Sequence, residues 1–112
     1  MKPRVNLWIE QDGEVVLSEW RVSLLEAIVE TGSISGAAAK LDVPYHRAWD
    51  KLEEMEKGLG MKLVVTQTGG TGGGGARLTP EGLDFVEKFR RFQAGFHDQV
   101  ESRFAEVFGS PG

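Results

Sequence analysis

The sequence predicts a mostly helical fold with a small β component, and three observations support that fold class. Between residues 18 and 60, apolar residues recur with the spacing of amphipathic helices. A glycine-rich stretch, QTGGTGGGGA, separates two short segments of strand-like composition. The last third of the chain has the periodicity of one long helix with an aromatic stripe. At 112 residues the chain can build one core, so we expect a single domain over residues 1–112.

Residues 1–17 have the pattern of a β-hairpin. In the segment Arg4–Glu10, apolar side chains occupy every second position, as in a half-buried strand. Asp12-Gly13 is a strong turn signal, and Glu14–Leu17 would return as the partner strand.

Residues 18–60 predict three helices. Ser18 can cap a first helix that runs to about Thr31, and Gly32 can end it in the left-handed conformation. Ser33 or Ser35 can cap a second helix, because a hydroxyl accepts an N–H that the first turn leaves unpaired. One face of this second helix carries Ile34, Ala37, Ala38 and Leu41.

The third helix follows a tight turn. Asp42-Val43-Pro44 interrupts the helical pattern, and Pro44 suits the first turn of a new helix. One arc of that helix carries Tyr45, Ala48, Leu52, Met55 and Leu59. Its other side chains are polar, which favours a helix-turn-helix whose second helix enters the DNA major groove. The alternative is a helical hairpin that only packs within a helical domain.

Residues 61–79 predict a wing, meaning a β-hairpin beside the helix-turn-helix. Lys62–Thr66 and Ala76–Thr79 are the two expected strands. A phosphate-binding nucleotide loop would need a strand, a loop and a helix with a lysine after the glycines, and Ala76 stands where that lysine should be. Glycines at a hairpin tip would let the backbone approach a phosphate closely. The alternative is a solvated loop without a ligand.

Residues 80–108 predict a long final helix. Thr79 can cap it, with Pro80 at its first position, and the pattern continues to about Val107. The candidate dimerisation stripe comprises Phe85, Phe89, Phe92, Phe96, Val100 and Phe104. A domain this small cannot cover so long an apolar stripe, so we expect pairing with a second copy. The alternative is a helix folded back over its own core, and Gly95 would mark a bend or a close crossing.

Composition and charge limit the function classes. The chain contains no cysteine, no apolar run long enough for a membrane span and no signal-peptide pattern, so we expect a cytoplasmic protein with no membrane contact. The net charge is −4, which is unusual for a nucleic-acid binder. His46 and His97 lie on different helices without metal-ligand spacing. We therefore expect no enzyme, no metal and no cofactor.

The candidate recognition residues lie in the first two turns of the third helix. They are Tyr45, His46, Arg47, Asp50 and Lys51. The guanidinium of Arg47 can pair with guanine, with a plain surface arginine as the alternative. His46 either donates to a phosphate or base or is simply solvated. Tyr45 is expected to pack against the neighbouring helix with its hydroxyl near a phosphate, while Asp50 would orient Arg47 or accept from a cytosine.

Further candidate contacts lie outside that helix. Ser33 and Ser35 could contact a phosphate or act only as caps. Arg77 is the only cation in the loop region, and a phosphate or the minor groove is its expected partner.

The segment Leu24–Leu83 resembles the amino-terminal winged-helix domain of ModE-type molybdate-responsive transcription regulators, a relative of the LysR-type DNA-binding domain. The motifs that carry the resemblance are GSIS at 32–35, AAAKL at 37–41, Tyr45 with Ala48-Trp49-Asp50, GGTGGGGARLT at 69–79, and Gly82. The resemblance implies a homodimer that binds double-stranded operator DNA with its recognition helix and wing.

The sequence departs from this family in ways that bear on function. Pro44 stands where the family commonly has serine, His46 where it often has a cation, and Thr71 where its wing often has lysine. At that position of the wing, Thr71 is the residue that we expect to contact DNA. Full-length members carry C-terminal oxyanion-binding domains, whereas this chain ends at Gly112. We expect DNA binding without molybdate sensing, with any effector sensed by a partner in trans.

Two hypotheses follow. The first is a sequence-specific, dimeric DNA-binding transcription regulator. The second is a winged-helix interaction module that has lost DNA binding and recruits a protein through its aromatic last helix. The acidic balance, His46 and Thr71 favour the second hypothesis.

Overall fold

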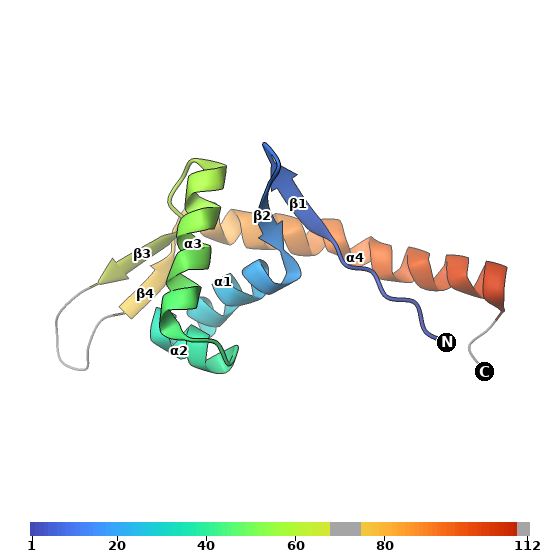
Figure 1. Cartoon of the computed structure of the whole chain (residues 1–112), viewed down its shortest axis with the longest axis horizontal. Coiled ribbons are helices and arrows are strands. Elements are labelled where there is room, and N and C mark those ends of the chain that lie inside the picture. The colour runs from blue at the N-terminus through green and yellow to red at the C-terminus, as the bar shows by residue number, and fades with distance from the viewer. Residues whose placement is uncertain (68–74, 110–112) are drawn as a thin grey trace.

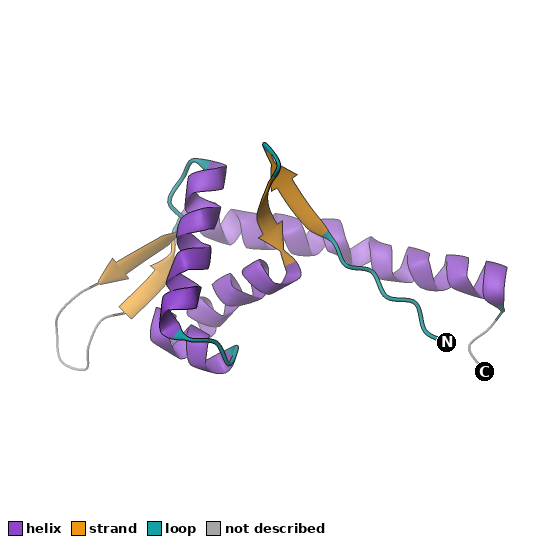
Figure 2. Cartoon of the chain, in the orientation of Figure 1, coloured by secondary structure: helices purple, strands orange, loops and turns teal. Residues whose placement is uncertain are grey.

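Four helices and four strands make up the described part of the chain, residues 1–67 and 75–109 of the computed structural model (Figure 1). The strands form two antiparallel hairpins, one before the first helix and one before the last (Figure 2). In chain order the elements are β1 (Trp8–Gln11), β2 (Glu14–Ser18), α1 (Glu19–Thr31), α2 (Ile34–Lys40), α3 (Tyr45–Leu59), β3 (Val64–Gln67), β4 (Gly75–Leu78) and α4 (Pro80–Phe108). The predicted fold class is confirmed.

Capping residues set the ends of the first helices. The Ser18 hydroxyl accepts a hydrogen bond from the N–H of Arg21 at 3.2 Å, so α1 begins where the sequence predicts. Gly32 ends α1 with φ of 75°, a left-handed conformation that glycine adopts without strain. Of the two serines that could cap α2, Ser33 does so, accepting from the N–H of Gly36 at 2.9 Å.

The core lies between α1, α2, α3 and the first half of α4. Ala37 and Ala48 are fully buried, and their small side chains let α2 and α3 approach closely. The largest fully buried side chains are Phe89, Leu24, Leu25, Ile28, Leu52, Met55, Leu63, Val16 and Val22. The three helices predicted over residues 18–60 therefore share one core, to which α4 adds Phe89.

The first strand is shorter than predicted. We expected it to begin at Arg4, whereas β1 begins at Trp8 and pairs with β2 with a bulge after Ile9. The partner strand sets this limit, because the chain turns into α1 directly after Ser18 and offers no further backbone to pair with. Residues before Trp8 run instead along the far end of α4 (Figure 1).

A backbone hydrogen bond joins the second hairpin to the helical core, because Ala76 on β4 donates its N–H to the carbonyl of Gly32 at 2.9 Å. The N–H of Thr79 donates to the carbonyl of Leu63 at 2.9 Å and closes the base of the hairpin itself. The strands are shifted by one or two residues from the predicted ranges. The predicted glycine-rich tip, including Thr71, lies outside the described residues.

The last helix begins where the sequence predicts, with the Thr79 hydroxyl accepting from the N–H of Gly82 at 3.0 Å. It continues through Gly95 as one helix to Phe108. Its first half packs on the core, and its second half projects beyond the other elements (Figures 1 and 2). The molecule is accordingly 58 Å long, with a radius of gyration of 16.9 Å against about 13 Å for a compact chain of this length.

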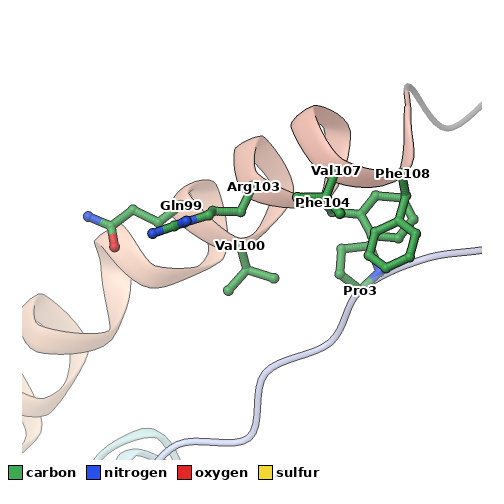
Figure 3. A pocket seen from close by; sticks show the side chains of 7 residues that line it. All are labelled: Pro3, Gln99, Val100, Arg103, Phe104, Val107 and Phe108. Atoms are coloured by element: carbon green, nitrogen blue, oxygen red, sulfur yellow. The ribbon is translucent and has the colours of Figure 1, made fainter.

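The aromatic stripe of α4 divides between two environments. Phe89 is only 1% exposed and belongs to the core, so its assignment to a dimerisation stripe is corrected. Phe92 is 49% exposed and Phe108 is 65% exposed. Figure 3 shows the N-terminal segment passing the last turns of α4, with Pro3 beside Phe104 and Phe108. Periodicity alone could not reveal this division, because it does not show how far the core extends along the helix.

Candidate nucleic-acid interface

The start of α3 presents polar side chains to solvent. His46, Arg47 and Asp50 are exposed, while Ala48 and Leu52 on the opposite face are buried in the core. This division follows from helical periodicity, which places residues three or four apart on one face. The exposed face matches the one that the sequence assigns to DNA recognition.

Pro44 is the N-cap of α3, so Tyr45 rather than Pro44 is the first helical residue. No side chain caps this helix start. Tyr45 is 52% exposed and packs edge-to-face on Trp49, with ring centroids 6.2 Å apart. Trp49 itself is half-buried against the core. Tyr45 thus packs on a residue of its own helix and keeps about half of its surface exposed.

The charges along α3 are partly neutralised. Lys51 forms an ion pair with Glu54 at 3.2 Å, and Glu54 also accepts from Arg21 at 3.0 Å. Among the described residues, neither a hydrogen bond nor an ion pair joins Asp50 to Arg47, although the sequence suggested that Asp50 orients it. Arg47 therefore extends from α3 with its charge unpaired within the described chain.

The stem of the wing lies against the start of α2. The hydrogen bond from Ala76 to Gly32 fixes this contact, and a Cβ added at Gly75 would lie 3.3 Å from the same carbonyl oxygen. Arg77, opposite Val65 in the hairpin, is exposed. Arg77 therefore extends from a strand that is anchored to the helix-turn-helix.

A groove of about 270 Å³ brings together residues from three parts of the chain. Ser33, Ser35 and Tyr45, which the sequence proposed separately, line it together. Thr66 and Gln67 on β3 also line it, and neither was predicted from the sequence. The available signal was two polar residues ending a β-branched strand just before the glycines.

The cations around this surface are mostly paired. Lys40 pairs with Glu30, and Lys62 pairs with Glu56 at 3.4 Å. Arg47 and Arg77 make no ion pair with any residue in ranges 1–67 and 75–109. The charge that is free to meet a phosphate is thus concentrated on these two arginines.

Comparison with known proteins identifies the fold and the family. The model of the family described as "Bacterial regulatory helix-turn-helix protein, lysR family" matches residues 21–83, more than half of the chain. The chain belongs to this family.

Several relatives match this LysR-type chain over most of its length. The molybdenum transport protein ModE of Azotobacter vinelandii is 36% identical over 104 residues, which cover 90% of the chain and 38% of that relative. The DNA-binding transcriptional dual regulator ModE of Escherichia coli K12 is 35% identical over 89 residues, covering 80% of the chain and 34% of the relative. The LysR-type chain is homologous to the N-terminal part of ModE regulators and spans little more than a third of these relatives.

A solved structure confirms the fold. Full-length LysG of Corynebacterium glutamicum, a LysR-type regulator with bound effector Arg, superposes with a TM-score of 0.58 at 23% identity. The match covers 79% of this chain and 29% of LysG. At this identity the likeness concerns the fold alone.

The LysR-type chain is thus a helix-turn-helix domain of a DNA-binding transcription regulator, and its family is one of regulators rather than enzymes. Within ranges 1–67 and 75–109, no cluster of three metal-binding side chains occurs. The helices described there also lack the combination of length and apolar composition that crossing a membrane requires.

Proposed function

We propose that this LysR-type domain acts as a homodimer that binds specific DNA sequences, with α3 in the major groove and the wing on the adjacent backbone or minor groove. Each protomer would read one half-site, and the half-sites would lie about one duplex turn or a multiple apart. Binding to chromosomal DNA would locate the protein in the cytoplasm.

One observation carries the proposal. The hydrogen bond from Ala76 to Gly32 holds the wing stem beside α2, and the groove below it also includes Tyr45 at the start of α3. A duplex that met the polar start of α3 would therefore also meet the wing. Arg47 would read a base edge, because a guanidinium matches the two acceptors of guanine. Arg77 would contact a phosphate or the minor groove.

The dimer contact would be made by α4. Phe92, Val107 and Phe108 are 49%, 71% and 65% exposed, whereas Phe96, Val100 and Phe104 between them are half-buried. An apolar groove of about 550 Å³ lies beside the first half of α4 and is lined by Ile9, Met61 and Phe85 among others. Exposed apolar surface on both halves of one helix favours mutual burial between two copies.

An antiparallel pair covers both halves at once. With a two-fold axis near Phe96, Phe92 lies opposite Val100 and Phe85 opposite Val107, since the members of each pair are equally far from Phe96. The C-terminal end of one helix then reaches the apolar groove of about 550 Å³ on the other protomer. A parallel pair would leave that groove open.

Single cysteines test this arrangement cleanly, because the chain contains none. In the antiparallel pair, Phe96→Cys should form a disulfide-linked dimer under mild oxidation, since the two copies meet near the axis. Phe104→Cys should not, because the two cysteines lie at opposite ends of the interface. Cross-linking of Phe104→Cys would indicate parallel helices, in which each residue faces its own copy. A protein that sediments as a monomer at micromolar concentration would contradict the dimer.

DNA binding is tested by selecting duplexes from a randomised pool and measuring retardation of the selected sequence in gels. We expect the variant Arg47→Ala/Arg77→Ala to abolish retardation. Arg103→Ala, at the far end of α4, is the matched control and should bind like the wild type. Failure to enrich any sequence would contradict the regulator and favour the protein-interaction module, whose docking surface would be the exposed end of α4.

A further inference from the structure

We propose that the groove of about 270 Å³ between the start of α3 and the wing stem holds one DNA backbone phosphate through uncharged hydrogen-bond donors, Ser35, Thr66 and Gln67. This site rests on the proposed DNA binding and specifies how an acidic domain engages the DNA backbone. Thr66 and Gln67 have no role in the function proposed above.

The groove is built from parts whose relative positions are fixed. Ser35 lies on α2, while Thr66 and Gln67 end the strand β3. In the hairpin, Thr66 lies opposite Ala76, and Ala76 is bonded to the Gly32 carbonyl just before α2. The donors on α2 and on the wing stem are therefore held at a set distance from each other, as a binding site for a small anionic group requires.

The donors are available. Thr66 and Gln67 are exposed, and their side chains make no hydrogen bond within the described chain. Ser35 makes only a long contact of 3.4 Å to the Ser33 hydroxyl. Ser33 already serves as the cap of α2, so it contributes less. Tyr45 borders the same groove and adds a phenolic O–H.

The lining chemistry suits a phosphodiester. The described residues that line this groove carry no charge, so no carboxylate repels a phosphate there. A different groove beside α3, near the N-terminal hairpin, has a charged lining, since Asp12, Glu14 and Glu54 line it together with Arg21 and Lys57. Hydroxyl and amide donors to a phosphate oxygen form charge-assisted hydrogen bonds, which are about twice as strong as neutral ones.

The geometry of B-DNA leads the backbone to this groove. One sugar-phosphate backbone separates each major groove from the adjacent minor groove. If α3 occupies the major groove and the wing the adjacent minor groove, that backbone must cross between them. The groove lies there, bordered by Tyr45 at the start of α3 and by Thr66 and Gln67 on the wing stem.

Uncharged donors predict a distinctive response to salt. A lysine or arginine that neutralises a phosphate releases counterions and steepens the salt dependence of binding. A hydroxyl or amide contributes affinity without neutralising the phosphate. Loss of this site should therefore weaken binding by a similar factor at every salt concentration.

The test uses a duplex selected by the wild-type protein from a randomised pool. In a series of duplexes, each phosphate in turn is replaced by an uncharged methylphosphonate. For the wild-type protein, we expect the phosphate held in this groove to be one position per half-site where affinity falls about tenfold, separate from any phosphate that Arg77 contacts. The variant Ser35→Ala/Thr66→Val/Gln67→Ala should bind the unmodified duplex at least about tenfold more weakly than the wild type does. Replacing the phosphate of this groove by a methylphosphonate should then weaken binding by the variant little further.

Controls separate this inference from the proposed function. Ser102→Ala, on the exposed far half of α4, should bind like the wild type. Circular dichroism should show the triple variant folded, and the methylphosphonate series on wild-type protein needs no variant. If a duplex is selected but no single phosphate is sensitive, or the triple variant binds like the wild type, this inference is wrong and DNA binding stands. If no duplex is selected, the proposed function fails and this site fails with it.

Discussion

Replacing Arg77 by glutamine should flatten the salt dependence of DNA binding, whereas replacing Arg47 should mainly relax sequence preference. The charge pairing in the structure supports this expectation. Three lysines near the proposed DNA surface pair with glutamates. They are Lys40 in α2, Lys51 in α3 and Lys62 just before the wing. Within the described chain, Arg47 and Arg77 have no such partner, and Lys57 lies in the last turn of α3, far from its start.

The number of free arginines sets the magnitude. Each phosphate that a cation neutralises on B-DNA contributes about 0.9 to the slope of log affinity against log salt concentration. If both arginines of each protomer contact phosphates, the dimer slope is about −3.6. If Arg47 contacts bases and only Arg77 contacts phosphate, the slope is about −1.8. Between 50 and 200 mM salt, affinity would then fall about 150-fold or about 12-fold, respectively.

Fluorescence anisotropy of a labelled selected duplex, titrated at several salt concentrations, measures this slope. Arg77→Gln should make it less steep by about 1.8, while the exposed control Arg103→Gln should leave it unchanged. Arg47→Ala should lower the preference for the selected duplex over a scrambled one. An unchanged slope for Arg77→Gln would refute the phosphate contact. A wild-type slope between about −7 and −9 would show that the three paired lysines of each protomer leave their glutamates to bind DNA.

Two further predictions concern stability. Gly82→Ala should lower the free energy of unfolding by about 1–3 kcal/mol in urea titrations, because the added Cβ would lie 2.4 Å from the backbone carbonyl oxygen of Leu63. Gly95→Ala is its control: the added Cβ meets nothing within 4 Å, so a gain of up to about 1 kcal/mol is expected, and equal effects at both positions would contradict this reasoning. The pKa of Glu19 is held below its ordinary value by hydrogen bonds from Gln93 and a neighbouring guanidinium. This carboxylate therefore stabilises the fold above the ordinary glutamate pKa, and the contribution is lost as pH falls through the lowered value. Urea unfolding of Glu19→Gln should show a smaller loss of stability in acid, and an unchanged pH profile would refute the prediction.

Features set by neighbours along the chain were predicted well from the sequence. Ser18 and Thr79 cap helices where expected, and Gly32 ends α1 in the left-handed conformation. A cap depends on a side chain and an N–H three residues later, so the sequence contains all the information needed. The start of β1 was predicted wrongly because it is not set by neighbours along the chain. The length of β1 depends on how much of its partner strand is free to pair.

Features set by residues far apart in the chain were not predictable in this way. Thr66 and Gln67 line a groove with Ser35 because β4 is bonded to Gly32, and local periodicity contains no trace of that contact. Phe89 repeats in register with the other aromatic residues of α4, yet it is buried in the core. The sequence identified the polar face of α3 and the wing, but their junction emerged only from the tertiary structure.

The polar contact between α1 and α4 explains how a projecting helix can have a defined direction. Apolar packing around Phe89 is not directional and would permit α4 to rotate about its axis. The Arg90 guanidinium removes that freedom, because it donates to both oxygens of Glu26 and, at 2.6 Å, to Glu19 on α1. A planar guanidinium that bridges two carboxylates on one face of α1, two turns apart, tolerates little rotation.

This restraint matters because any error in the direction of α4 grows along its projecting half. A small rotation at Arg90 would move Phe104 and Phe108 by a larger amount, and with them the surface proposed to meet a second protomer. Half-exposed ion pairs contribute little to stability, so the Arg90 cluster is better understood as a device for orientation. In the proposed dimer it would couple the face of α3 to the two-fold axis. The spacing between two recognition helices would then depend on a polar contact far from the DNA.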